Sequence, residues 1–435
     1  MTVIGRPALA RLESLSIRGM KLGLAAIGSV CERLGHPERR VPAVLVAGTN
    51  GKGSTAATLA SIATASGVKA GLYTSPHLIR VNERIRVGED DISDEELDGV
   101  LERVFWAGDA APQIPLTYFE ALTAAAFHVF ADRRLELAVL EVGLGGRYDA
   151  TNVTPARLSV VTSIGLDHTE ELGSSLAAIA REKAGVFRAG RPALGLAWAP
   201  EAREALRESA EATGALWHDA SRELSVQVRE IGLSGTRFDL STPDRRLEVS
   251  TPLPGVHQAW NAALAVRSAE LFAEPRISLD ASSLAQGLAS VRWPGRLERF
   301  KVRGRTVLLD GCHNPEGAEA LGRFLREAGL EGRCTLLFGA MADKDIEEIA
   351  RLLFPKAGRV RLVQAPSPRA ATPEELVRRV RPVRPDALPG DGLKRELGKL
   401  LAQANGAPII VAGSLYLVGE ARALLLAGEL EEGLS

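Results

Sequence analysis

The sequence predicts an α/β protein with two doubly wound, mostly parallel sheets, one in a large N-terminal domain and one in a smaller, Rossmann-like C-terminal domain. Short runs rich in β-branched residues alternate with longer helical patterns, which is the rhythm of repeated β-α-β units. This alternation stops near residue 290 and starts again after about residue 295. A chain of 435 residues, 46% of them hydrophobic, is long enough for two or three domains with sizeable cores.

The N-terminal elements follow from short apolar runs bounded by Gly or Asn. Residues 44–47, 138–142 and 158–163 are predicted as buried parallel strands because they are short, apolar and β-branched. Residues 54–66 and 119–130 are predicted as helices between them.

The region 213–253 differs from its surroundings, because polar and apolar residues alternate there between turn residues. It is predicted as a small antiparallel addition to the first domain. The Pro-Gly breaker in 290–295 then marks the domain boundary, which gives domains at 1–293 and 294–435. The second domain is predicted to contain strands 306–310, 334–338, 360–364 and 409–412, and helices 315–327, 346–354, 373–381 and 393–404.

Composition excludes several classes of protein. Lys and Arg number 53 against 54 Asp and Glu, so the net charge of −1 argues against nucleic-acid binding by a basic surface. The three cysteines have neither zinc-ligand spacing nor a disulfide framework. No apolar run is long enough to cross a membrane, and charged residues interrupt the N-terminal stretch where a signal peptide would lie. A cytoplasmic protein without membrane attachment is expected.

The strongest local signal is the segment GTNGKGST at 48–55, which links a predicted strand to a predicted helix. Glycines let backbone N–H groups approach phosphate oxygens, and the helix N-terminus favours the negative charge. Lys52 would neutralise the β- and γ-phosphates of ATP, and a hydroxyl of Ser54 or Thr55 could reach Mg²⁺. The usual pattern is imperfectly matched, because Val46 stands at its first Gly position. An ordinary Gly-rich turn is the alternative.

Charged residues also follow buried strands, where open α/β sheets bind ligands. Glu141 ends one apolar strand, and Asp167 and His168 follow the next. Burying an acid in such a run is costly unless it pairs or binds a metal, so a magnesium-linked role is favoured over a structural ion pair. Lys183 lies on an amphipathic helix and, taken alone, predicts only a solvated charge.

Eleven motifs occur in order from residue 48 to 420: GTNGKGST, SPHL, LTYFE, LEVGLGGRYDATN, LDHTEELG, REKAGVF, HQAWNAA, WPGRLE, LDGCHNPEG, MADKD and GSLYLVGE. This series resembles the folylpolyglutamate synthase/dihydrofolate synthase family of the Mur ligase superfamily. The resemblance implies a P-loop ATPase domain that is Mur-ligase-like, followed by a glutamate-ligase domain. It also implies that ATP phosphorylates a carboxylate of a pterin-bearing acid and that the amine of L-glutamate then attacks the acyl phosphate.

The resemblance assigns roles to residues at matching positions. It places ATP against Gly51, Lys52, Gly53, Ser54, Asn261, Arg296 and Asp310, with His313 beside Asp310. It makes Ser75, Glu141, His168 and Lys183 ligands of two Mg²⁺ ions, with Lys183 carried as a carbamate so that it offers an anionic oxygen. The catalytic set implied is Lys52, His168, Lys183, Asp310 and His313. A requirement for K⁺ is a further implication.

Three segments match the dihydropteroate-binding segments of the family: Ser14, Leu15, Ser16 and Ile17; Thr117, Tyr118, Phe119 and Glu120; and Tyr148, Asp149 and Ala150. An aromatic such as Phe119 could stack on the pterin, and Glu120 or Asp149 could accept from its amino group. The first segment also fits part of an amphipathic helix. Cys312 and Tyr148 depart from the residues common in the family, and the second puts pterin preference in question.

Four other functions would account for part of the sequence. A monofunctional folylpolyglutamate synthase would keep only tail extension. A Mur ligase for UDP-sugar peptides would need a further N-terminal domain, and the phosphate loop begins at residue 48. A nucleotide-driven switch or a binding protein would leave Glu141, His168 and Lys183 without a role. The predicted partners are folate or dihydropteroate, L-glutamate and ATP, and a monomer is expected.

Overall fold

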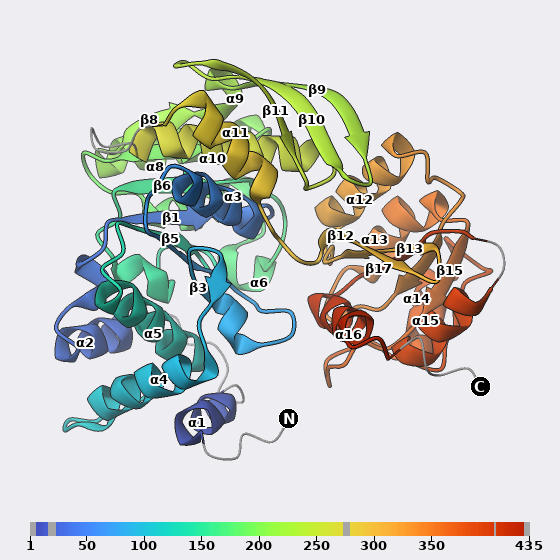
Figure 1. The fold of residues 1–435 in the computed structure, drawn as a ribbon, viewed down its shortest axis with the longest axis horizontal. Coiled ribbons are helices and arrows are strands. Elements are labelled where there is room, and N and C mark those ends of the chain that lie inside the picture. The colour runs from blue at the N-terminus through green and yellow to red at the C-terminus, as the bar shows by residue number, and fades with distance from the viewer. Residues whose placement is uncertain (1–5, 16–22, 273–278, 404–405, 430–435) are drawn as a thin grey trace. The chain divides into compact units, whose positions relative to one another are not determined.

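The computed structural model describes residues 6–15, 23–272, 279–403 and 406–429 (Figure 1). The chain divides into two compact units. The N-terminal unit comprises 1–226, 240–247 and 261–291, and the C-terminal unit comprises 227–239, 248–260 and 292–435. The predicted domain boundary at 293/294 stays a prediction. The observed units divide the sequence at nearly the same place, but the C-terminal unit also includes the internal segments 227–239 and 248–260.

The N-terminal unit is built on an eight-stranded sheet in the order β4-β3-β2-β5-β1-β6-β7-β8. Neighbouring strands from β2 to β8 pair in parallel, and the β2–β3 and β3–β4 pairs are antiparallel. The strands are β1 (Ala43–Ala47), β2 (Ala70–Tyr73), β3 (Ile85–Val87), β4 (Asp90–Asp91), β5 (Leu137–Glu141), β6 (Leu158–Val161), β7 (Pro192–Gly195) and β8 (Leu216–Asp219).

Helices cover both faces of this sheet, and Figure 1 shows α3 and α11 on one face and α2, α4 and α5 on the other. Ala43, Leu45 and Ala47 belong to the core with residues of α4 and α5, while the intervening valines of β1 are also fully buried. Burial on both faces explains the uninterrupted apolar run of β1. The helices are α1 (Pro7–Leu15), α2 (Ala25–Arg33), α3 (Lys52–Ala65), α4 (Asp94–Asp109), α5 (Tyr118–Asp132), α6 (Thr169–Leu172), α7 (Leu176–Lys183), α8 (Pro200–Thr213), α9 (Ala220–Glu223), α10 (Val256–Phe272) and α11 (Ala281–Ser290), with 3₁₀ turns η2 (Pro37–Arg39), η3 (Val81–Arg84), η4 (Ala150–Val153) and η5 (Ala184–Val186).

The strand order places a topological switch point between β1 and β6. After β1 the chain crosses through α3 to β2 on one side, and after β6 it leads to β7 on the other side. Because β2, β5, β1 and β6 are parallel neighbours, their carboxyl ends lie at one edge. Ligands of open α/β sheets bind at such an edge, beside the switch point.

A three-stranded sheet follows, in the order β11-β10-β9. The predicted addition at 213–253 began too early, because β8 pairs in parallel with β7 and so extends the large sheet. The strands of the addition are β9 (Ser225–Gly232), β10 (Gly235–Ser241) and β11 (Arg246–Thr251).

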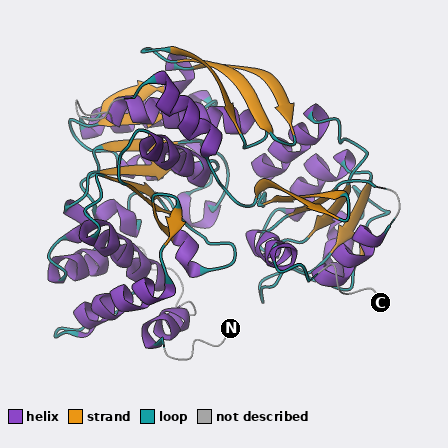
Figure 2. Cartoon of the chain, viewed as in Figure 1, coloured by secondary structure: helices purple, strands orange, loops and turns teal. Residues whose placement is uncertain are grey.

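The C-terminal unit holds a six-stranded sheet in the order β12-β13-β17-β14-β15-β16, parallel except for the β12–β13 pair. Its core includes Phe338 and Phe354, whose rings meet edge to face with centroids 5.1 Å apart. Strands and helices alternate here, as Figure 2 shows. The predicted fold class is confirmed. The elements are β12 (Arg296–Val302), β13 (Arg305–Asp310), α12 (Pro315–Glu327), β14 (Thr335–Phe338), α13 (Ile346–Leu353), η6 (Phe354–Lys356), β15 (Arg359–Leu362), α14 (Pro373–Val380), β16 (Leu388–Pro389), α15 (Leu393–Ala402), β17 (Ile409–Ala412) and α16 (Leu415–Leu426).

Among the helices in the described part of the chain, none combines the length and apolar character needed to cross a bilayer.

Candidate functional site

The loop between β1 and α3 forms a cradle of backbone groups. Gly51 precedes α3 with a φ of 83°, and Gly48 has a φ of 149°, a backbone conformation that L side chains rarely adopt. A Cβ at Gly48 would overlap the hydroxyl of Thr162, and one at Gly51 would overlap the side-chain oxygen of Asn261. Both glycines are therefore required by space as well as by conformation. The loop lies at the N-terminus of a 14-residue helix, where the helix dipole favours an anion.

Hydrogen bonds tie this loop to the segment that follows β6. The backbone N–H of Thr49 donates to the carbonyl of Ser163 (2.9 Å), and its hydroxyl accepts from the N–H of Gly165 (3.0 Å). The N–H of Asn50 donates to the hydroxyl of Ser163 (2.9 Å), and the hydroxyl of Thr162 donates to the carbonyl of Asn50 (2.6 Å). The two loops flanking the switch point are thus held as one unit.

Two lysine side chains converge on one oxygen of the loop. Lys52 Nζ donates to the carbonyls of Gly48 (3.0 Å) and Thr49 (3.1 Å). Lys183 Nζ, from the end of α7, donates to the same Gly48 carbonyl at 2.9 Å. Lys183 is buried, so the interpretation of this residue as a solvated charge is wrong. Two cationic side chains at the start of a helix favour a strongly anionic ligand at this loop.

Ser75 and Glu141 are brought together by the parallel pairing of β2 and β5. Glu141 ends β5 and is buried, and one of its carboxylate oxygens accepts from the N–H of Ser75 at 3.1 Å. A hydroxyl and a carboxylate oxygen are hard ligands, which suit Mg²⁺ when it keeps several waters and binds phosphate oxygens. The hydroxyl of Thr55, buried in the first turn of α3, has no hydrogen-bond partner among the described residues. These donors fit the predicted metal.

His168 stands at a strained backbone position in the loop after β6. Its φ is 52°, its N–H donates to the carboxylate of Asp167 (3.0 Å), and its ring is half-exposed. Across the described residues, no cluster of three or more His, Cys, Asp or Glu side chains has metal-binding geometry. The assignment of His168 and a carbamate on Lys183 as metal ligands stays a prediction.

The predicted nucleotide residues of the C-terminal unit lie where β12 begins and β13 ends, because Arg296 pairs with Asp310 in this antiparallel ladder. Asp310 is buried, and its carboxylate accepts from the N–H groups of Leu297 (3.1 Å) and Cys312 (3.0 Å). Burial raises the pKa of Asp310, while the charge of Arg296 and these hydrogen bonds oppose the rise. His313 places Nδ1 2.9 Å from the carbonyl of Gly311.

The predicted pterin segments have extensive structural roles of their own. Thr117 and Glu120 form a capping box at the start of α5, in which Glu120 accepts from the Thr117 N–H (2.9 Å) and hydroxyl (2.8 Å). Asp149 accepts four hydrogen bonds, from the N–H groups of Gly143 and Leu144 and from the N–H and hydroxyl of Thr151. A carboxylate has about four lone-pair positions, so these bonds hold Asp149 firmly in its own loop, and its assignment to the pterin stays a prediction.

Phe119 is half-buried and packs near Tyr73, with ring centroids 6.0 Å apart, whereas Tyr148 is exposed. Ser14 donates to the carbonyl of Arg11, and Leu15 is in the hydrophobic core, as the amphipathic-helix interpretation of this segment expects. The other two predicted residues of that segment, Ser16 and Ile17, lie outside the described residues. Ala150 begins η4 and is buried.

Sequence reasoning missed Arg84 and His77. Burial lowers the pKa of His77 to about 4, helped by the charge of Arg84. His77 lies in the loop after β2, and Arg84 is the last residue of η3. A polar residue in such a segment usually indicates only solvent exposure. Burial in the folded protein distinguishes Arg84 from an ordinary surface arginine.

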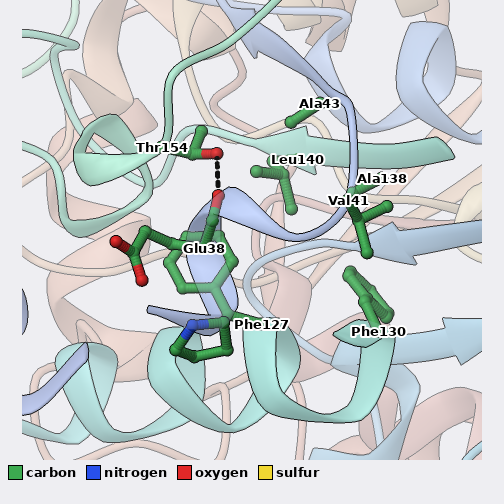
Figure 3. Close-up of a pocket in the computed structure, with 9 residues that line it drawn as sticks. Glu38, Val41, Ala43, Phe127, Phe130, Ala138, Leu140 and Thr154 are labelled. Atoms are coloured by element: carbon green, nitrogen blue, oxygen red, sulfur yellow. Dashed lines mark hydrogen bonds between the residues drawn. The ribbon is translucent and has the colours of Figure 1, made fainter. Parts of the chain in front are cut away.

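A hollow beneath the sheet is unrelated to this site. It is lined by residues near the start of β1 and by η2 and α5, and Figure 3 shows the hydroxyl of Thr154 donating across it to the carbonyl of Glu38 (2.7 Å). It leaves no room for a water molecule.

Comparison with known proteins defines the class first. The Mur ligase middle domain matches residues 46–269, and the Mur ligase glutamate ligase domain matches residues 295–415. These two matches, together with the Gly-rich loop at the switch point of the first sheet and the second, mostly parallel sheet, define the class as a Mur ligase.

The relatives define the family within that class. The dihydrofolate synthase/folylpolyglutamate synthase of Bacillus subtilis is 34% identical over 412 residues, covering 93% of this chain and 95% of its own. The folylpolyglutamate synthase of Lacticaseibacillus casei is 34% identical over 402 residues, covering 91% and 92%. The structure of E. coli FolC in complex with DHPP and ADP matches with a TM-score of 0.85 and 30% identity, over 99% of this chain and 100% of that one. The chain belongs to the dihydrofolate synthase/folylpolyglutamate synthase family, as its motifs predict.

Proposed function

We propose that this protein is an ATP-dependent ligase that adds L-glutamate both to folates, extending their glutamate tail, and to 7,8-dihydropteroate, forming dihydrofolate. The observation that carries this is the near-complete structural match to FolC in complex with DHPP and ADP. The phosphate loop with its converging lysines supports it independently, because this loop is suited to the triphosphate of ATP.

The chemistry must activate a poor electrophile. A carboxylate oxygen of the acid attacks the γ-phosphorus of ATP, the bond to the β-phosphate oxygen breaks, and an acyl phosphate and ADP form. The amine nitrogen of glutamate then attacks the acyl carbon, phosphate leaves with its bonding electrons, and the nitrogen loses a proton. The N–H groups of the loop and Lys52 would stabilise the charge on the transferring phosphoryl group.

The metal site belongs to the same proposal. Ser75 and Glu141 would hold Mg²⁺ together with the Thr55 hydroxyl, which has no partner among the described residues. His168 and a carbamate on Lys183 would complete the ligands of two ions. When bound, Mg²⁺ neutralises phosphate charge and orients the oxygens for transfer. Arg296, Asp310 and His313 would contribute nucleotide contacts from the C-terminal unit, and K⁺ is a further expected cofactor. We also expect a cytoplasmic monomer.

The test is phosphate release from Mg·ATP with L-glutamate, using either dihydropteroate or tetrahydrofolate as the acid and mass spectrometry to identify the products. Glutamylated product from both acids is the expected result. The L. casei relative is named folylpolyglutamate synthase alone, so turnover only with tetrahydrofolate would favour the monofunctional alternative. No product from either acid would overturn the proposal and favour a UDP-sugar peptide ligase.

A further inference from the structure

Arg84 is a buried cation beside the predicted metal and pterin residues. It is the last residue of η3 and only 8% exposed. Its backbone carbonyl accepts from the N–H of Thr74 at 3.0 Å, which fastens Arg84 next to the loop that carries Ser75. Its guanidinium lies over the ring of Tyr118, 5.2 Å from the centroid. Arg84 therefore stands between the residue predicted to bind metal and the segment predicted to bind the pterin acid.

The hydrogen bonding of Arg84 differs from that of two other buried arginines. Arg267 pairs with three carboxylates at 2.7 to 3.1 Å, and Arg305 donates to three backbone carbonyls. Arg84 donates from Nε to the Nδ1 of His77 at 3.0 Å. Among the described residues, no carboxylate or carbonyl accepts from its guanidinium. A buried charge without a counterion destabilises a protein, so such an arrangement is typical of a site completed by a ligand.

The N–H groups of Arg84 and His77 that do not take part in the bond between these two side chains indicate the chemistry of the ligand. Because Nδ1 of His77 accepts from Arg84, the proton of the neutral ring is on Nε2, which becomes a further donor. Among the described residues, the terminal nitrogens of Arg84 have no hydrogen-bond partner, and they do not belong to the fully buried atoms without one, so they keep some exposure to solvent. A guanidinium fork with both terminal nitrogens available matches the two oxygens of a carboxylate.

We propose that Arg84, supported by His77, docks a carboxylate of the acid substrate. This inference rests on the proposed function, in which the acid spans from the pterin segment containing Tyr118 to the phosphate loop. The carboxylate has two possible sources. Dihydropteroate has only the carboxylate that reacts, whereas tetrahydrofolate also has an α-carboxylate on its glutamate that stays unmodified.

The experiment compares the full-length protein with Arg84→Met, Arg84→Lys and the control Arg267→Met. KM and kcat are measured for dihydropteroate, tetrahydrofolate, ATP and glutamate, and melting temperatures are recorded without ligands. We expect Arg84→Met to raise the KM of an acid substrate about 10- to 100-fold, with KM for ATP within about twofold of wild type. Arg84→Lys keeps the positive charge but loses the pair of terminal guanidinium nitrogens, so it should raise the KM of the acid substrate less than Arg84→Met does. Arg84→Met should melt at or above the wild-type temperature, and Arg267→Met should melt lower.

The two acids separate the sources of the carboxylate. A raised KM for both acids assigns Arg84 to the reacting carboxylate, and a raised KM for tetrahydrofolate alone assigns it to the α-carboxylate. An unchanged KM for both acids in a folded variant overturns the proposal, whatever its melting temperature. If Arg84→Met does not fold, Arg84→Lys decides by the same criterion. Wild-type turnover tests the proposed function separately, so the two failures are distinguishable.

Discussion

Gly51→Ala tests whether the loop before α3 must keep its observed shape to use ATP. Gly51 and Gly67 flank the same helix, with φ values of 83° and 78°. An alanine pays about 1 kcal/mol or slightly more for this left-handed conformation at either position. At Gly67 nothing lies within 4 Å of the added Cβ, so no other cost arises. Gly67→Ala is therefore a matched control that measures the free-energy cost of the left-handed backbone conformation alone.

The additional cost at Gly51 comes from Asn261. The added Cβ would lie about 1 Å inside van der Waals contact with the side-chain oxygen of Asn261, and 3.1 Å from its Cγ. Asn261 is buried, so the loop must yield or the side chain must leave its position. A displacement of about 1 Å in a group that positions reacting atoms costs roughly 100-fold in rate.

The assay measures kcat/KM for ATP at saturating acid and glutamate, together with thermal melting. Gly67→Ala should lose about 1 kcal/mol of stability, seen as a melting temperature lower by about 2 to 4 °C, and Gly51→Ala should lose at least as much. Only Gly51→Ala should also lose about 100-fold in kcat/KM. If Gly51→Ala keeps kcat/KM within threefold of Gly67→Ala, the loop is not the cradle that we infer.

Three further predictions concern other groups. Lys183→Ala should lower ligase turnover at least about 100-fold, with partial recovery in Lys183→Glu if a carbamate is used, and near-wild-type turnover would contradict this role. Asp149→Asn should lower the free energy of unfolding, measured with urea, by about 2 to 4 kcal/mol, because an amide cannot accept from all four donors. An unchanged urea midpoint would refute this structural role of Asp149. Burial lowers the pKa of His257 to about 4, aided by the charges of Arg296 and Arg323. The unfolded chain therefore binds the additional proton below about pH 6.5, and stability should fall by at most about 3 kcal/mol as pH drops from 6.5 to 4, a slope that His257→Gln should flatten in unfolding titrations.

Elements whose signals are local were predictable from the sequence. The helix predicted at 315–327 and the strand predicted at 409–412 occur with those bounds, because a Pro following an Asn cap starts the helix and an isolated apolar run sets the strand. The Gly-rich loop between β1 and α3 was predictable for the same reason, since glycines, a lysine and hydroxyl residues are consecutive there, and its role in binding phosphate stays a prediction. Strand β8 was misassigned, because its alternating pattern does not reveal which sheet it joins.

Relations between distant residues depended on the tertiary structure. The hydrogen bond between Ser75 and Glu141 exists because β2 and β5 pair in parallel. The hydrogen bond between Thr49 and Gly165 exists because β1 and β6 also pair in parallel. The convergence of Lys52 and Lys183 on Gly48 likewise joins residues far apart in the chain.

By itself, the sequence determined the fold class, the order of most elements, the Gly-rich turn between β1 and α3 and, through its motifs, the family. These properties depend on periodicity and on residues adjacent in the chain. The tertiary structure decided that Lys183 is buried, that Asp149 holds its own loop, and that Arg84 is a buried cation without a carboxylate partner among the described residues. The physical reason is that burial and hydrogen-bond partners are set by the pairing of strands and the packing of helices from distant parts of the chain.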